Sequence, residues 1–166
     1  MKYMKSLIMT GTFLIAVATI NIAGAQSASA ACVDYQYSYS TTTKTCVKYI
    51  QILANEIYAK SNVGAYRAPL VVDGKYGSLT TSYITNIQAY SNVTLRNPDG
   101  SQGQTIFLSK DGITGRQTWA VLCNYSHVFR SNPNYYVLSA AGCTKSDGTY
   151  TAFDYFYAVG MSSTPH

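Results

Sequence analysis

The chain has 166 residues, enough for one domain with extensions, and 47% of them are hydrophobic. Its formal net charge of +5, from 12 Lys and Arg against 7 Asp and Glu, is too small a basic excess to indicate a nucleic-acid partner. The 16 tyrosines can bury their rings or stack on sugars, so the composition permits glycan binding without requiring it.

The first thirty residues have the order of a secretory signal. Lys2 and Lys5 precede an apolar stretch, and small residues follow it up to Ala30. We predict that residues 1–30 are a cleaved signal peptide, which leaves a mature chain with 10 Lys and Arg, 7 Asp and Glu, and a charge of about +3. An uncleaved anchor stays open as the alternative, because the apolar stretch is nearly long enough to span a bilayer.

All four cysteines follow the signal, and an even number in an exported chain predicts two disulfides. We favour Cys32–Cys46 and Cys123–Cys143, because each pair brackets a short segment outside the best helical patterns. A Cys46–Cys123 bridge between the first and last helices is the competing pairing. Residues 31–45, rich in Tyr, Ser and Thr, are predicted to form an irregular lead-in held by a disulfide.

The first helix is predicted over residues 46–60. Thr45 is available as its N-cap, and Asn62 or Gly64 lies near its exit. The apolar positions recur at three- and four-residue spacing, which predicts one buried face. They are Val47, Ile50, Leu53, Ala54 and Ile57.

A second helix is predicted over residues 78–90, after the short apolar run 70–72 and a tight turn at Asp73-Gly74. Its β-branched residues and threonines give it poor intrinsic propensity, so it depends on packing. Its inward positions are predicted to be Leu79, Tyr83, Ile84 and Ile87.

Residues 91–108 are predicted to form a long loop or a hairpin around the turn at 97–100. A third turn begins at Asp111 and leads into a helix with Trp119, Leu122 and Cys123 on its inward face.

The C-terminal extension, residues 124–166, leaves two alternatives open. Residues 135–138 and the aromatic segment 150–159 flank a predicted turn at 145–148, which favours two strands of a hairpin. Alternatively, the third helix continues through His127 and a fourth element packs beside it, tied by the last two cysteines.

An internal repeat is the most specific feature of the sequence. Residues 73–80 and 111–118 both read D-G-x-x-G-x-x-T, 38 residues apart. We predict that Asp and the first Gly form a turn needing positive φ, that the second Gly allows a close helix entry without a Cβ, and that Thr binds a free backbone donor. The turn-forming positions are Asp73, Gly74 and Gly77 in the first copy and Asp111, Gly112 and Gly115 in the second.

The order of these motifs resembles the peptidoglycan-binding domain family, in which V-x-x-L-Q-x-x-L-N precedes two D-G-x-x-G-x-x-T turns. The resemblance covers about residues 46–123, where CVKYIQILAN and two glutamines, Gln51 and Gln88, occupy the family's order. It implies a mainly α fold: a small three-helix bundle, disulfide-stabilised in this chain, with residues 124–166 as a Tyr-rich extension. It also implies recognition of bacterial cell-wall peptidoglycan.

The chain departs from that pattern in three ways. Ala54 stands at the second Leu of the first motif, 22 residues separate Gln88 from Asp111, and a long tail follows Cys123. The inserted segment or the tail is able to cover or replace the family's binding surface.

Little in the sequence indicates catalysis. Asp73 and Asp111 occupy the same turn signature, which explains both as turn formers rather than as a carboxylate pair. His127 lacks an evident free thiol partner, and no Cys-x-x-Cys pattern suggests zinc. We therefore predict a non-enzyme that uses no cofactor and no metal.

The resemblance makes the side formed by the two turns the candidate binding surface. Four residues are expected to contact ligand: Tyr76, Gln88, Arg116 and Gln117. In the alternative interpretation, Gln51, Gln88 and Trp119 are structural, with the amides bonded to turn backbones.

The resulting prediction is a secreted, extracellular or wall-associated protein that binds peptidoglycan or its muropeptides without cleaving it. It has no nucleic-acid partner and contacts membrane only through an uncleaved signal. A surface scaffold that binds another envelope protein and a cryptic wall hydrolase are the two alternatives.

Overall fold

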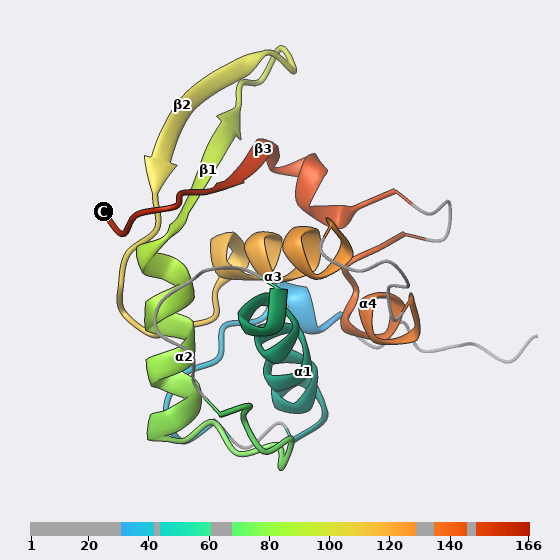
Figure 1. Cartoon of the computed structure of the whole chain (residues 1–166). Coiled ribbons are helices and arrows are strands. Elements are labelled where there is room, and N and C mark those ends of the chain that lie inside the picture. The colour runs from blue at the N-terminus through green and yellow to red at the C-terminus, as the bar shows by residue number, and fades with distance from the viewer. Residues whose placement is uncertain (1–30, 42–43, 61–67, 129–134, 146–148) are drawn as a thin grey trace, which may run out of the picture.

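The computed structural model describes residues 31–41, 44–60, 68–128, 135–145 and 149–166, and these form a mixed α/β domain (Figure 1). The helices are α1 (Lys44–Lys60), α2 (Ser78–Ala89), α3 (Arg116–Val128) and α4 (Tyr135–Ala141), with 3-10 turns η1 (Cys32–Asp34) and η2 (Thr151–Asp154). The strands are β1 (Ser91–Arg96), β2 (Gln102–Phe107) and β3 (Phe156–Met161), in the order β2-β1-β3. The prediction of a mainly α bundle is therefore wrong, because the domain also contains a three-stranded antiparallel sheet.

Helix α1 buries the face that its periodicity predicts. All five predicted apolar positions are buried, from Val47 to Ile57. The helix begins at Lys44, so Thr45 lies inside it and is not its N-cap. The predicted exit residues Asn62 and Gly64 fall outside the described residues.

Helix α2 runs beside α1 and ends one residue earlier than predicted, with Tyr90 as its C-cap. Tyr83, Ile84 and Ile87 are buried as expected. Leu79 is not: its side chain is 72% exposed, because the first turn of α2 lies at the surface next to the loop that precedes it. The inward face of α2 therefore starts at Thr80.

Helix α3 crosses near one end of α1 (Figure 1) and buries the predicted residues Trp119, Leu122 and Cys123. The Trp119 ring meets the buried ring of Tyr37 edge to face, with 5.9 Å between ring centroids. A residue of the lead-in is thus part of the same hydrophobic core as the helices.

The segment 91–108 is a β-hairpin that projects from the helices, which confirms the hairpin alternative (Figure 1). The Gly100 amide donates to the Asn97 carbonyl at 2.9 Å, and Gly100 has a φ of 82°. The backbone N–H and the hydroxyl of Ser101 both donate to Asp99 Oδ1, at 2.9 Å and 2.6 Å. The predicted turn at 97–100 thus forms the tip of the hairpin.

The C-terminal extension follows the second alternative: α3 continues through His127 to Val128, and helix α4 packs against the core, tied by the Cys123–Cys143 disulfide. Residues 135–138 lie in helix α4, which buries Val137, Leu138 and Ala141 at helical spacing. Strand β3 pairs antiparallel with β1, so that β1 becomes the central strand. The expectation of two paired strands at 135–138 and 150–159 is therefore wrong, and the alternative of a fourth packed element is confirmed.

The two disulfides are Cys32–Cys46 and Cys123–Cys143, which confirms the favoured pairing and excludes the Cys46–Cys123 bridge. They indicate that the chain folds in an oxidising compartment. No helix among the described residues is both long and apolar enough to span a membrane.

Candidate functional site

The first copy of the repeated turn is held by the buried side chain of Gln51. Its Nε2 donates to Asp73 Oδ1 at 2.9 Å, to the Lys75 carbonyl at 3.1 Å and to Thr80 Oγ1 at 3.2 Å. Its Oε1 accepts the Gly74 amide at 2.9 Å. One α1 side chain therefore binds both the turn and the start of α2. We call this group of five residues the first clamp.

The second copy repeats these bonds one for one through Gln88. Its Nε2 donates to Asp111 Oδ1 at 2.9 Å, to the Ile113 carbonyl at 2.9 Å and to Thr118 Oγ1 at 3.1 Å. Its Oε1 accepts the Gly112 amide at 2.8 Å. We call these five residues the second clamp. The match shows that the sequence repeat is also a structural repeat, in which the glutamine of one helix fixes the entry to the next.

Both repeated aspartates take part in their turns through backbone hydrogen bonds. Asp73 Oδ1 also accepts the Lys75 amide at 2.8 Å, and Asp111 Oδ1 accepts the Ile113 amide at 2.9 Å. Each carboxylate therefore closes an Asx-turn. The Gln51 amide, followed by the Lys75 backbone, lowers the pKa of Asp73 below its ordinary value.

The first glycine of each copy is required by the backbone. Gly74 has a φ of 75° and Gly112 a φ of 70°. A Cβ on Gly74 would lie 2.7 Å from the Lys44 carbonyl oxygen, and a Cβ on Gly112 would lie 2.6 Å from Thr81 Cγ2. Both the backbone conformation and the available space therefore exclude a side chain.

Two parts of the predicted turn chemistry are wrong. A Cβ on Gly77 or Gly115 would meet nothing within 4 Å, so these glycines do not allow a close helix entry. The hydroxyls of Thr80 and Thr118 donate to the carbonyls of Lys75 and Ile113, so they satisfy acceptors rather than a free backbone donor.

Tyr76 joins the two turns and does not face solvent as predicted. Its side chain is 2% exposed, its hydroxyl donates to the Gly112 carbonyl at 2.8 Å, and the same oxygen lies 2.9 Å from Thr114 Oγ1. Burial raises its pKa to about 12. The phenol has become a hydrogen-bonded part of the core because its partners belong to the other turn, 36 residues away.

Gln88 is also only 2% exposed, which corrects the expectation that it projects into solvent. Its four clamp bonds support the structural interpretation that the sequence left open. Arg116 is exposed and Gln117 is partly exposed, so both remain accessible to a ligand as predicted. Only two of the four residues predicted to contact ligand are therefore accessible at the surface.

Each clamp borders a surface hollow at equivalent positions. The first hollow, about 340 Å³, lies over the first clamp, and the second hollow, about 220 Å³, lies over the second. The surroundings differ in chemistry. The first hollow is bordered by Val71, Ser78 and Leu79, and the equivalent positions around the second hollow are Ser109, Arg116 and Gln117.

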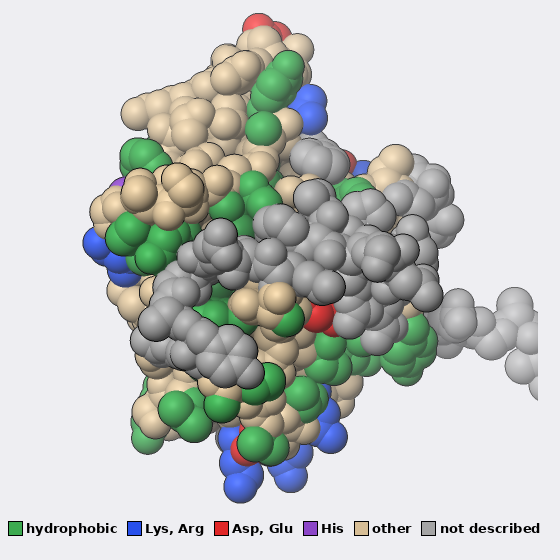
Figure 2. Space-filling view, viewed as in Figure 1, with side chains coloured by type: hydrophobic (Ala, Val, Ile, Leu, Met, Phe, Trp, Pro, Cys, Tyr) green, Lys and Arg blue, Asp and Glu red, His purple; other side chains and the backbone are tan. Residues whose placement is uncertain are grey.

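Figure 2 shows hydrophobic side chains at the lower end of the molecule, close to a group of Lys and Arg. Val71 is 77% exposed and Leu79 is similarly open, so the first hollow has an apolar border. The second hollow has a border of hydroxyl, guanidinium and amide groups, which suits a polar ligand.

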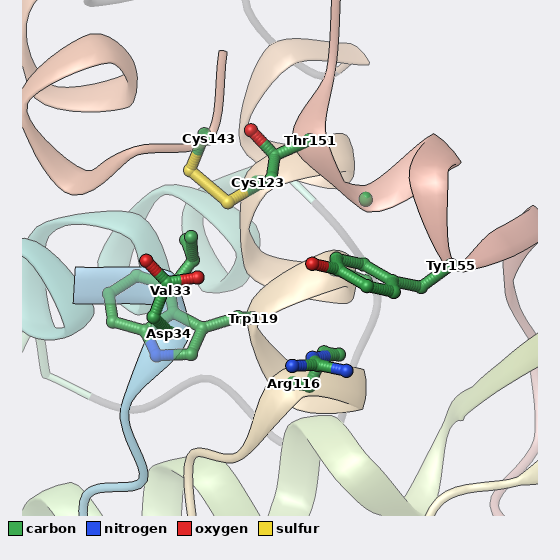
Figure 3. Close-up of a pocket in the computed structure, with 10 residues that line it drawn as sticks. Val33, Asp34, Arg116, Trp119, Cys123, Cys143, Thr151 and Tyr155 are labelled. Atoms are coloured by element: carbon green, nitrogen blue, oxygen red, sulfur yellow. A yellow bond between two sulfur atoms is a disulfide. The ribbon is translucent and has the colours of Figure 1, made fainter. Parts of the chain in front are cut away.

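Another concavity, which we call the small hollow, lies between η1, α3 and η2 (Figure 3). Asp34 comes from η1, Arg116 from the start of α3 and Tyr155 from the residue after η2. Sequence reasoning missed Asp34 and Tyr155, because three segments distant in the chain form this hollow. For Asp34 the available signal was its closeness to Cys32, since a disulfide fixes a short segment in place.

Comparison of the chain with protein-family models, with curated proteins and with solved structures gave no match. The described residues contain no group of three or more His, Cys, Asp or Glu side chains arranged to hold a metal ion.

Proposed function

We propose that this chain is a secreted, non-catalytic protein that binds bacterial cell-wall peptidoglycan, with the second hollow as the contact surface. The observation that carries the proposal is the pair of matching clamps. They correspond to the two D-G-x-x-G-x-x-T turns and the two glutamines on which the resemblance to peptidoglycan-binding domains rests.

The chemistry of the second hollow supports a glycan-peptide ligand. Arg116 can donate two parallel hydrogen bonds to a carboxylate of a stem peptide, and Gln117 can donate to and accept from sugar hydroxyl and acetamido groups. The clamp below holds the helix start that carries both side chains, so little ordering is needed when ligand binds.

The non-catalytic part of the proposal is supported by how the reactive groups are used. Asp73 and Asp111 each accept a glutamine amide and a backbone amide, so their role in the turn is sufficient to explain them. Both cysteine pairs are disulfides, which leaves no free thiol among the described residues for a cysteine hydrolase. The side chain of His127 lies outside the structural description.

The repeat itself supplies the control for a binding test. Arg116→Ala and Gln117→Ala alter the second hollow, and Ser78→Ala and Leu79→Ala alter the equivalent positions at the first. We expect each second-hollow variant to reduce retention on purified sacculi about tenfold, the effect of losing a hydrogen bond to a charged or fixed polar group. The first-hollow variants should bind as the unchanged chain does.

Retention should be measured at two salt concentrations, together with the muropeptides released. Retention that disappears at high salt and is equal in all four variants would reduce the interaction to charge attraction and contradict the proposal. Released muropeptides would show hydrolysis, and their loss in His127→Ala would place it at that residue.

A protein-binding role is the second candidate, and the exposed apolar border of the first hollow favours it. Val71, Val72 and Leu79 are exposed large hydrophobic residues close together in the fold. This candidate predicts no retention on sacculi and capture of an envelope protein that Leu79→Ser abolishes. Capture unaffected by Leu79→Ser would argue against it.

A further inference from the structure

The first copy of the repeated turn borders another concavity, which we call the basic hollow, between the lead-in and the start of α1. It holds about 300 Å³, and pockets for small ligands begin at roughly 300 Å³. Figure 2 shows Lys and Arg side chains gathered at the lower end of the molecule, where α1 and α2 begin (Figure 1). The residues of the lining that bear on a ligand are Tyr39, Ser40, Thr41, Lys44, Lys75 and Gly77.

The positive charge of the basic hollow has no ion-pair partner. Lys44 and Lys75 are exposed, and neither forms an ion pair with another described residue. No described Asp or Glu lines the hollow, and the first turn of α1, which Lys44 opens, contains no acidic residue. Asp73 attracts Lys75, but its carboxylate already accepts the Gln51 side-chain amide and the Lys75 backbone amide. The hollow therefore favours an anionic ligand.

The backbone that carries the two lysines is fixed before a ligand arrives. The Lys75 amide donates to Asp73 Oδ1 at 2.8 Å, and the Lys75 carbonyl accepts the Gln51 side-chain amide at 3.1 Å. Lys44 packs directly on Gly74, where a Cβ would lie 3.2 Å from Lys44 Cβ. Because both lysines are anchored beside the same glycine, their ammonium groups can reach one bound anion.

The lead-in forms the other side of the basic hollow. The Ser40 amide donates to the Tyr76 carbonyl at 3.0 Å, which holds this segment against the turn. Ser40 has a φ of 72°, a strained conformation that no other non-glycine residue of the described part adopts. Tyr39 is 66% exposed, so its ring is available to cover the apolar face of a sugar. Hydroxyl groups and an aromatic ring thus lie close to two cations.

Gly77 keeps the basic hollow open. A Cβ at this position would meet no atom within 4 Å, and its φ of −94° is accessible to any residue. The fold therefore does not require glycine here, in contrast to Gly74, whose φ is 75°. Because Gly77 lines the hollow, a side chain there would take up space beside the lysines. The absence of a side chain is explained by a ligand more readily than by packing.

We infer that the basic hollow binds a sugar that carries a phosphate group. The ammonium groups of Lys44 and Lys75 bind the phosphate as point charges, and the Tyr39 ring covers one face of the sugar. This inference goes beyond the proposed wall-binding function and does not rest on it, because the basic hollow and the second hollow share no residue. Free sugar phosphates and the sugar phosphodiesters of an envelope polymer share this chemistry, and the test separates these two sources.

The inference is tested by titrating glucose 1-phosphate into the oxidised chain and following backbone amide NMR shifts. We expect a dissociation constant on the order of 1 mM, with shifts centred on residues 39–41 and 74–77. Glucose and inorganic phosphate should each bind about tenfold more weakly, because each supplies only part of the contacts. The glycerol diester of glucose 1-phosphate represents the polymer. Tighter binding of the diester identifies the polymer as the source, and tighter binding of the monoester identifies free sugar phosphates.

Lysine variants separate the site from general charge attraction. Lys44→Gln and Lys75→Gln should each weaken glucose 1-phosphate binding about tenfold. Lys48→Gln is the matched control, because it removes the same charge from an exposed position one turn further along α1, outside the lining. It should weaken binding less than about twofold. Equal losses in all three variants, or equal affinity for glucose and glucose 1-phosphate, would overturn the inference.

A glycine variant tests the space in the hollow without removing charge. Gly77 is the N-cap of α2, a position that favours asparagine, so Gly77→Asn should keep the stability of the fold. It should nevertheless weaken glucose 1-phosphate binding about tenfold, because the new side chain occupies the hollow. Gly115→Asn, the equivalent change in the second turn, should leave this binding unchanged. Unchanged affinity in Gly77→Asn would overturn the assignment to this hollow.

The two proposals fail separately. Gln117→Ala should reduce sacculus retention and leave glucose 1-phosphate binding intact, whereas Gly77→Asn should do the reverse. Leu79→Ser, which tests the protein-binding candidate, should also leave glucose 1-phosphate binding intact. Glucose 1-phosphate binding without sacculus retention would support the basic hollow alone. Sacculus retention without any binding of glucose 1-phosphate or its diester would overturn this inference and leave the wall-binding proposal standing.

Discussion

The two clamps use the same hydrogen bonds under different surfaces. Gln51 and Gln88 each bind a carboxylate, a carbonyl, a threonine hydroxyl and a glycine amide. Above these bonds, Val71 and Leu79 border one hollow, and Ser109 and Gln117 border the other. The repeated positions therefore carry the shared hydrogen bonds, and the variable positions between them set the chemistry at the border of each hollow. The following predictions test that separation.

The largest effect is expected when a clamp glutamine becomes an acid. Gln88→Glu replaces the Nε2 donor by a carboxylate that faces Asp111 and the Ile113 carbonyl. We expect the free energy of unfolding to fall by roughly 3–5 kcal/mol at neutral pH, as for an unpaired buried charge. In acid the carboxyl is protonated, so the decrease should be smaller. Urea unfolding at several pH values measures this. Gln51→Glu should behave alike, and Gln104→Glu on the exposed strand β2 is the control. An unchanged free energy of unfolding in Gln88→Glu would mean that the second clamp does not stabilise the fold.

The next effect separates the two glycines of each turn. Gly74→Ala and Gly112→Ala should each cost about 2–4 kcal/mol, because a side chain is strained at positive φ and meets neighbouring atoms. Gly77→Ala and Gly115→Ala should each cost less than about 1 kcal/mol, since their Cβ positions are open. Thermal unfolding of the four variants provides the comparison, and equal losses at all four glycines would contradict it.

Breaking the link between the turns should have a smaller effect. Tyr76→Phe leaves the Gly112 carbonyl without its phenol donor, at a cost of about 1–3 kcal/mol. The folded chain holds the pKa of Tyr76 at about 12, above the unfolded value near 10, so its contribution is complete below pH 10 and is lost as the pH rises toward 12. The variant should lack that part of the alkaline loss of stability. An unchanged alkaline profile would show that Tyr76 ionises without cost.

Lowering the pH should reduce the stability of the fold through protonation of Asp73 in the first turn. Its pKa is lowered in the folded state, chiefly by the Gln51 amide, so the carboxylate stabilises the fold above the ordinary Asp range. That contribution disappears as the pH falls through the lowered value. Asp73→Asn should therefore flatten the acid side of the stability profile in urea unfolding. Asp99→Asn, which removes another carboxylate of lowered pKa in a separate turn, should flatten it independently.

The smallest stability effect is expected from exchanging the variable positions. Leu79→Gln and Gln117→Leu each place one copy's residue in the other, and both positions are at the surface. Stability should stay within about 0.5 kcal/mol of the unchanged chain. Sacculus retention should fall in Gln117→Leu and persist in Leu79→Gln. A large loss of stability in either variant would mean that these positions are not separable from the clamps.

The helices could be predicted because their signals are local. The spacing of Val47 to Ile57 identifies α1, and the repeated turn locates the starts of α2 and α3. The favoured disulfides followed from short separations of 14 and 20 residues. Each of these inferences depends on residues that lie near one another in the chain.

The sheet and the buried site residues depend on distant partners. Strand β3 pairs with β1, so that Val93 lies opposite Val159, and the aromatic sequence around these residues does not specify this pairing. Tyr135-Tyr136-Val137-Leu138 has strand-forming composition, but α4 forms there because Val137, Leu138 and Ala141 fill one side of the core. Tyr76 is polar at one end, and only its partners in the second turn account for its burial.

Each clamp joins a glutamine to an aspartate further along the chain. It does not constrain the conformation of the segment that connects these two residues. Gln51 and Asp73 are 22 residues apart, and Gln88 and Asp111 are 23 apart. The first interval includes most of a long helix, and the second includes a projecting hairpin. The same anchor points thus accept unlike inserts of nearly equal length. The tip of the hairpin is accordingly a place where foreign sequences could be grafted for display, with the clamp keeping the body of the domain in register.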